Sequence, residues 1–96
     1  MMYASYIEMQ LKVGKTAEAL EIAEGMKPEI APMGIKQFIV IDKGNDNMLA
    51  LAFYDTAEEQ EAASPKAQEL LARLSDLLAA PPERKQLEVP IAEPVL

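Results

Sequence analysis

The chain has 96 residues, of which 50% are hydrophobic and 26% charged, the composition of one folded globular domain with a single core. The absence of Cys and His excludes disulfides, zinc–thiolate sites and histidine-based catalysis, and a formal net charge of -7 argues against nucleic-acid binding. No apolar run reaches the roughly 20 residues of a membrane-spanning helix, and no leader sequence is present, so we expect a cytoplasmic protein without a membrane partner.

The first third of the chain predicts a strand followed by a helix. Side chains of two unlike kinds alternate over residues 3–12, which indicates a strand with two different faces. Thr16 is a suitable N-cap for a helix, because apolar residues recur after it at helical spacing, namely Ala19, Leu20, Ala23 and Met26. Pro28 interrupts this pattern, so we expect a kink or a second short helix there.

A hairpin is predicted in the middle of the chain. The β-branched run at 35–42 indicates a strand buried on both faces, and residues 43–47 have the composition of a hairpin loop. The second strand of the hairpin should cover residues 48–54.

Two helical pieces and a last strand are predicted in the remainder. Thr56 and Glu59 have the spacing of a capping box, and Ser64 with Pro65 resembles a second N-cap followed by proline at the first helical position. The longer piece should begin at Pro65, carry a leucine stripe and stop at the two prolines 81–82. The last strand is expected over 86–92.

This order of elements predicts an α+β ferredoxin-like fold, β-α-β-β-α-β. Residues 1–96 should form one domain with a four-stranded antiparallel sheet and two helices on one face. The opposite face should be half apolar and covered by a second copy of the chain, which makes a homodimer. We expect that face to carry Ala4, Tyr6, Glu8, Ala50, Ala52 and Tyr54.

The segment from Tyr54 to Leu78, with YDTAEE at 54–59 and AASP at 62–65, resembles the dimeric α/β-barrel superfamily. Its nearest branch is the antibiotic biosynthesis monooxygenase-like (ABM) group. The resemblance implies that two subunits join their sheets into one barrel, and that each has a cavity between sheet and helices. Characterised members oxidise aromatic polyketides or quinol-like compounds without metal or flavin, so the resemblance implies no cofactor and no metal site.

Three residues are candidate catalytic groups. The resemblance places Tyr54 where active members carry an aromatic side chain just before the second helix, and Ala50 where they carry an amide. Tyr54 could donate a hydrogen bond to a phenolic substrate or stack on it, or it could simply pack. Tyr6 and Glu8 share a strand face, and a carboxylate beside a phenol in an apolar cavity could have a raised pKa suited to accepting a proton. Their structural alternative is a hydrogen bond at the dimer interface.

Three functions remain open at this point. The chain could be a cofactor-independent monooxygenase acting on an aromatic or quinol-like small molecule, a non-catalytic protein that binds a small ligand, or a domain that only dimerises. The enzyme predicts a closed apolar cavity that contains Tyr54 and one ionisable or amide partner. The binding protein predicts the cavity without that partner, and the dimerisation domain predicts side chains that fill it.

Overall fold

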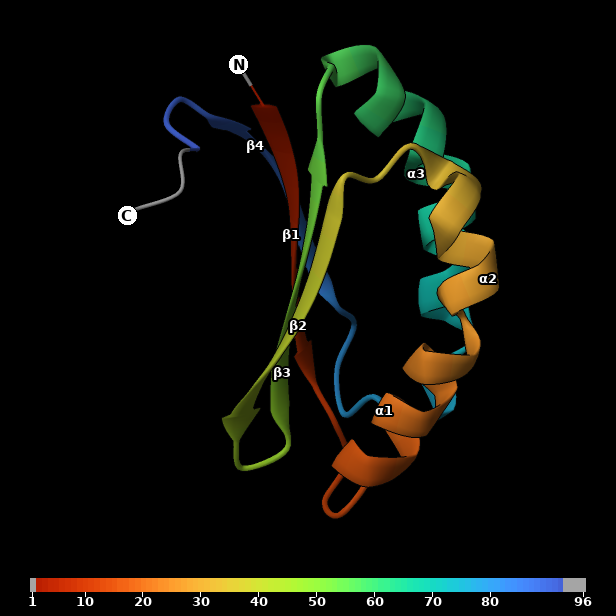
Figure 1. Ribbon diagram of the computed structural model, residues 1–96. Helices are drawn as coiled ribbons and strands as arrows, with labels where there is room; N and C mark the ends of the chain where they lie inside the picture. Colours follow the sequence, from red (N-terminus) through yellow and green to blue (C-terminus); the bar gives the residue numbers. More distant parts are fainter. Residues whose placement is uncertain (1, 93–96) are drawn as a thin grey trace.

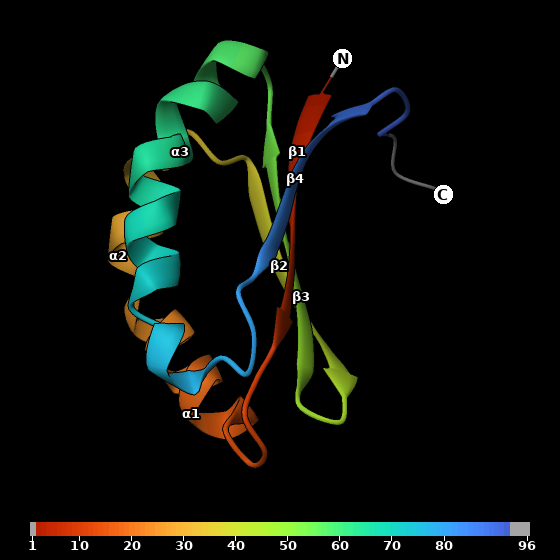
Figure 2. The same ribbon diagram turned by 180° about the vertical axis from the view of Figure 1, so that it is seen from behind.

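A four-stranded antiparallel sheet is covered on one face by the helices in the computed structural model, which describes residues 2–92 (Figures 1 and 2). This arrangement confirms the predicted α+β ferredoxin-like fold. None of the helices in that range is long and apolar enough to cross a membrane. The strands are β1 (Met2–Gln10), β2 (Gln37–Gly44), β3 (Asn47–Tyr54) and β4 (Glu83–Val89), in the spatial order β2-β3-β1-β4. The helical segments are α1 (Thr16–Gly25), α2 (Lys27–Ile30), α3 (Ala57–Ala72) and the 3-10 turns η1 (Ala31–Met33) and η2 (Ser75–Leu77).

The register of the sheet decides which side chains face the helices. Ser5 lies opposite Ala52 and Ile7 opposite Ala50, so these residues share the face that the helices cover. Tyr6 lies opposite Leu51 on the other face, which we call the open face. The prediction that Ala50, Ala52 and Tyr54 share a face with Ala4, Tyr6 and Glu8 is therefore wrong. Both alternating sets of β3 are apolar, so hydrophobicity alone did not specify its orientation.

The exposure of β2 also differs from the prediction. Phe38 is 40% exposed, because β2 is an edge strand with a neighbour on one side only, and Ile41 is 41% exposed, because it lies on the open face. The predicted burial on both faces is wrong for a single chain. The hairpin itself is confirmed, since Asn45 and Asp46 form its turn with φ values of 53° and 59°.

The two main helices begin differently from one another. Thr56 caps α3 as predicted, because its hydroxyl oxygen accepts a hydrogen bond from the backbone N–H of Glu59 at 3.1 Å. Thr16 is not an N-cap but the first residue of α1, and its hydroxyl donates to Asp46 Oδ1 at 2.7 Å. The predicted second short helix after Gly25 is present as α2.

α3 is one continuous helix, and the prediction of two helical pieces is wrong. Pro65 lies inside it and removes one backbone donor, yet Ala63 before it and Leu70 after it are both buried. Packing of this face against the sheet therefore outweighs the lost hydrogen bond. α3 also ends at Ala72, so the last leucines of the predicted stripe lie beyond the helix.

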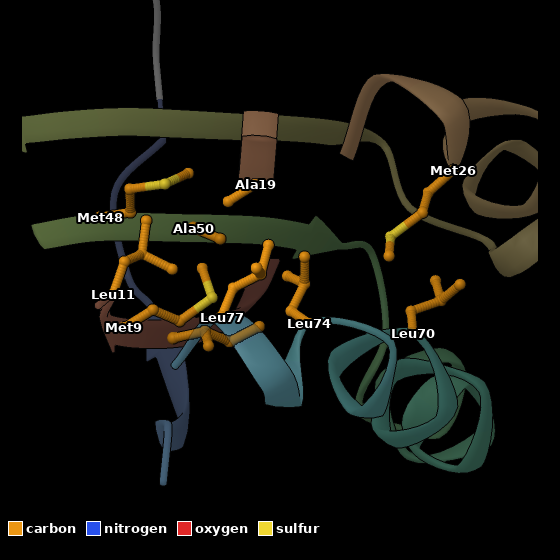
Figure 3. Close-up of a cluster of buried hydrophobic side chains, with 10 residues drawn as sticks. Met9, Leu11, Ala19, Met26, Met48, Ala50, Leu70, Leu74 and Leu77 are labelled. Carbon is orange, nitrogen blue, oxygen red and sulfur yellow. The ribbon is translucent and has the colours of Figure 1, made fainter. Parts of the chain in front are cut away.

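The main core lies between the sheet and the helices, as Figure 3 shows. Ala19 from α1 and Leu70 from α3 meet side chains from β1 and β3 there. Burial of this layer removes the apolar faces of these four elements from water, which is the main source of stability. Its buried members are Ile7, Met9, Leu11, Ala19, Met26, Met48, Ala50, Leu70, Leu74 and Leu77.

Candidate functional site

A cavity of about 80 Å³ lies between the sheet and the helices. Short side chains explain the space, because Ala50 and Ala52 face the helices from the middle of β3. This volume is smaller than the roughly 300 Å³ of typical small-molecule sites, so a ring-sized ligand requires side chains to move. Four methionines line the cavity, and their unbranched side chains adapt readily to a ligand. They are Met9, Met26, Met33 and Met48.

The polar groups of the cavity come from β1, β3 and α3. Tyr54 is 1% exposed and Ser5 is 2% exposed, and both line the cavity. Ser5 Oγ accepts a hydrogen bond from Nε2 of the buried Gln60 at 3.3 Å. The hydroxyl of Ser5 is also close enough to the Tyr54 phenol to affect its pKa. Tyr54, Ser5 and Gln60 thus form a buried polar group beside an apolar space.

Arg84 adds a positive charge to this cavity from β4. It lies opposite Ile7, on the helix-covered face. Its Nη2 donates to Ser64 Oγ at 3.3 Å, and the same oxygen accepts from Gln86 Nε2 at 3.1 Å. Arg84 Nε is buried and has no hydrogen-bond partner within residues 2–92.

The electrostatics make Tyr54 a hydrogen-bond donor. Burial raises the pKa of the Tyr54 phenol, and the charge of Arg84 and the nearby Ser5 hydroxyl only partly oppose this effect. The phenol is therefore neutral near pH 7. None of the described residues that line the cavity is Asp or Glu, and no group of three or more acidic side chains within residues 2–92 could hold a metal ion.

Tyr6 and Glu8 lie on the open face, away from Tyr54. The Tyr6 hydroxyl donates to Glu8 Oε1 at 2.5 Å, and Lys43 Nζ lies 3.4 Å from the same oxygen. These two contacts lower the pKa of Glu8, and the hydrogen bond to Glu8 raises the pKa of Tyr6. A raised pKa, the possibility considered for Glu8 in an apolar cavity, is therefore not found, because its partners stabilise the charged form.

Sequence reasoning thus found one of the four polar residues at this site, Tyr54, and missed Ser5, Gln60 and Arg84. Tyr54 was identified through its place before α3. Arg84 was missed because the last strand was expected to begin at 86, whereas β4 begins at Glu83. Ser5 was visible as a polar member of the buried set of β1, but Gln60 gave no signal because exposed helix residues are commonly polar.

Comparisons with known proteins agree with the fold. No family model and no curated protein matches the chain significantly. Among solved structures, a protein of unknown function from Nitrosomonas europaea, NE2512, has a TM-score of 0.83 and 17% identity, over 99% of this chain and 95% of that one. A second Nitrosomonas europaea protein, provisionally named an antibiotic biosynthesis monooxygenase, has a TM-score of 0.77 and 17% identity, over 93% and 90% of the two chains.

A third similar structure belongs to a named oxygenase. It is a variant of SnoaB, a cofactor-independent oxygenase from Streptomyces nogalater, with a TM-score of 0.78 and 12% identity over 98% of each chain. Identities this low establish a shared fold and leave the reaction open. The chain therefore has the ferredoxin-like fold of the antibiotic biosynthesis monooxygenase-like proteins.

Proposed function

We propose that this protein is a cofactor-independent monooxygenase that oxidises an aromatic or quinol-like small molecule in the cavity beneath its helices. One observation carries the proposal: a buried, neutral Tyr54 shares an apolar cavity with an ionisable partner, Arg84. This combination is what the enzyme hypothesis predicts. The fold shared with SnoaB, which is a cofactor-independent oxygenase, is consistent with it.

In a cofactor-independent reaction the substrate supplies its own electrons. In the simplest case a ring CH2 becomes a ketone: two C–H bonds break, one atom of O2 forms the carbonyl, and the other leaves as water with both hydrogens. Tyr54 and Arg84 would donate to the oxygen of the substrate enolate and stabilise its negative charge in a water-poor site. Because no carboxylate lines the described cavity, the substrate itself must be acidic enough to ionise.

A second candidate is a binding protein that uses the same cavity without catalysis. The observation that favours it is the lack of an Asp or Glu among the described lining residues, since a general base is common in enzymes that remove protons from carbon.

We also propose that two copies associate through the open face. Leu49, Leu51 and Phe53 of β3 face that side together with Ile39 and Ile41 of β2. The helices lie on the other side, so within residues 2–92 no element covers these side chains (Figure 2). A half-apolar sheet surface of this kind favours a partner with the same surface.

The test of the oxygenase is oxygen uptake with a hydroxylated anthrone, which has a CH2 between two aromatic rings. The natural chain should exceed the protein-free rate, with one O2 consumed per substrate. Tyr54→Phe should lower that rate by roughly 10²-fold, as expected for loss of one donor to a developing oxyanion, with little change in melting temperature.

Tyr6→Phe is the matched control, because it removes the same hydroxyl from the open face and should leave the rate unchanged. If Tyr6→Phe lost activity while Tyr54→Phe kept it, the reaction would take place on the open face and not in the cavity, which would contradict the proposal. No acceleration by the natural chain with this substrate class would overturn the oxygenase and favour the binding protein.

A further inference from the structure

We propose that the cavity recognises the ionised form of its ligand, an apolar ring compound with an enolate, phenolate or carboxylate oxygen, and that Arg84 provides this recognition. The inference rests on the proposed function for the existence of a ligand in this cavity. It goes further by making the ionised oxygen a general requirement for binding, including ligands that are not oxidised, and by assigning the discrimination between charged and neutral ligands to Arg84.

The first observation is the incomplete hydrogen bonding of Arg84. Its Nε is the one side-chain nitrogen or oxygen within residues 2–92 that is buried without a hydrogen-bond partner. An unsatisfied buried donor is costly, so native proteins generally provide a partner for such groups. Nη2 already donates to Ser64, which orients the guanidinium of a residue that lines the cavity.

The second observation is the uncompensated charge of Arg84. Arg73, the other arginine, forms ion pairs with Glu29 and Glu69, whereas no acidic partner of Arg84 is found across residues 2–92. Its side-chain hydrogen-bond partner within residues 2–92, Ser64 of α3, is uncharged, and so at neutral pH are the polar residues that line the cavity with it, Ser5 of β1 and Tyr54 of β3. A positive charge beside an apolar space favours a ligand that brings a negative one.

The third observation is that Tyr54 supplies a second donor beside the same space. Arg84 is close enough for its charge to act on the Tyr54 phenol, and both residues line the cavity. A guanidinium and a neutral phenol can both donate to one ionised oxygen, and hydrogen bonds with an ionised acceptor are the stronger kind. A neutral carbonyl or ether oxygen would gain less from the same two groups.

The test compares 2-naphthoate with 2-naphthamide, two rings of the same shape that differ in charge at neutral pH. Isothermal titration calorimetry should show that the natural chain binds naphthoate with a dissociation constant roughly tenfold or more lower than that for naphthamide. This difference corresponds to one hydrogen bond to a charged group. Arg84→Gln should lose this preference and bind naphthamide as before. Lys12→Gln, which removes one positive charge from an exposed side chain outside the cavity, should keep it.

Arg84→Lys provides a second variant should Arg84→Gln fail to fold, which melting curves will show. It keeps the charge but loses the Nε–H and the fork geometry, so its preference for naphthoate should be smaller than that of the natural chain. Three outcomes would overturn the inference. The preference for naphthoate could be as large in Arg84→Lys as in the natural chain, or it could be preserved in Arg84→Gln. The natural chain could also show no preference, which includes failure to bind either compound. Naphthoate has no oxidisable CH2, so this outcome is independent of oxygen uptake.

Discussion

Two alanines in the middle of β3 determine that the cavity exists. Ala50 and Ala52 are 4% exposed, and Ala is uncommon at the centre of a sheet, where β-branched and aromatic side chains pack better. Their Cβ atoms leave a space of about 80 Å³ between sheet and helices. The space is therefore a property of specific residues and not a consequence of the fold.

Filling this space should separate ligand binding from stability. Ala50→Leu adds three carbons to the cavity, so naphthoate affinity and oxygen uptake should fall by roughly tenfold or more, the cost of displacing a well-fitted ligand. The melting temperature should stay the same or rise, because filling 80 Å³ can gain up to about 2 kcal/mol at about 24 cal/mol per Å³. Calorimetry measures both quantities.

The control for that substitution is Ala17→Leu, which adds the same carbons to an exposed position of α1. It should leave binding unchanged. Unaltered binding in Ala50→Leu would show that the ligand lies outside the cavity.

At the level of elements, α2 and α3 are joined by an ion cluster centred on Glu29. Its carboxylate accepts from Lys66 Nζ at 2.9 Å and from Arg73 Nη2 at 2.8 Å, and it also pairs with Arg73 Nη1. These contacts lower the pKa of Glu29 to about 2, with the Arg73 hydrogen bond as the largest cause. The cluster is partly exposed, so salt will screen it.

This cluster should make stability depend on pH in the acidic range. Because the folded pKa of Glu29 is lower than its usual 4.5, its contribution is complete above pH 4.5 and is lost as the pH falls towards 2. The melting temperature of the natural chain should therefore drop more steeply over this range than that of Glu29→Gln. Thermal melts at several pH values and at low and high salt will measure the difference.

Glu24→Gln is the control for this prediction, because within residues 2–92 the ion pair of Glu24 is with Lys27, which is close by in sequence and exposed. Its melting temperature should fall with decreasing pH as steeply as that of the natural chain. If the melting temperatures of the natural chain and Glu29→Gln fell equally steeply with decreasing pH, the role of the cluster would be contradicted.

The elements also show why the sequence predicted the topology but not the site. β1, the hairpin turn and the Thr56 cap each have a local pattern that fixes their structure, so the order of elements followed correctly. β3 is apolar on both faces, and its orientation depends on how β1 and β2 pair with it, which no local pattern contains. Arg84 lines the cavity because β4 pairs with β1, which is also a long-range contact, so its role became visible only in the structure.

The whole molecule has one covered and one open sheet face. The helices occupy the first, and the second presents apolar side chains such as Leu51 and Leu87, the latter 47% exposed. Each partner of a stable complex typically buries about 800 Å². The open face of four strands is the surface of this chain best suited to provide such an area.

Leu51→Lys should convert the proposed dimer into a monomer. Leu51 lies near the centre of the open face, between Tyr6 of β1 and Ile39 of β2, so a charge there would be buried without a partner in the dimer. Light scattering behind a sizing column should give twice the chain mass for the natural protein and the single mass for the variant. Ala17→Lys, on the exposed side of α1, should remain a dimer.

The same variant distinguishes assembly from binding. Arg84 and Tyr54 already line the same cavity in a single chain, so monomeric Leu51→Lys should still prefer naphthoate to naphthamide. A natural chain that is monomeric, or a variant that stays dimeric, would contradict the open-face interface. Loss of naphthoate binding together with the dimer would show instead that the second copy holds the cavity in its binding shape.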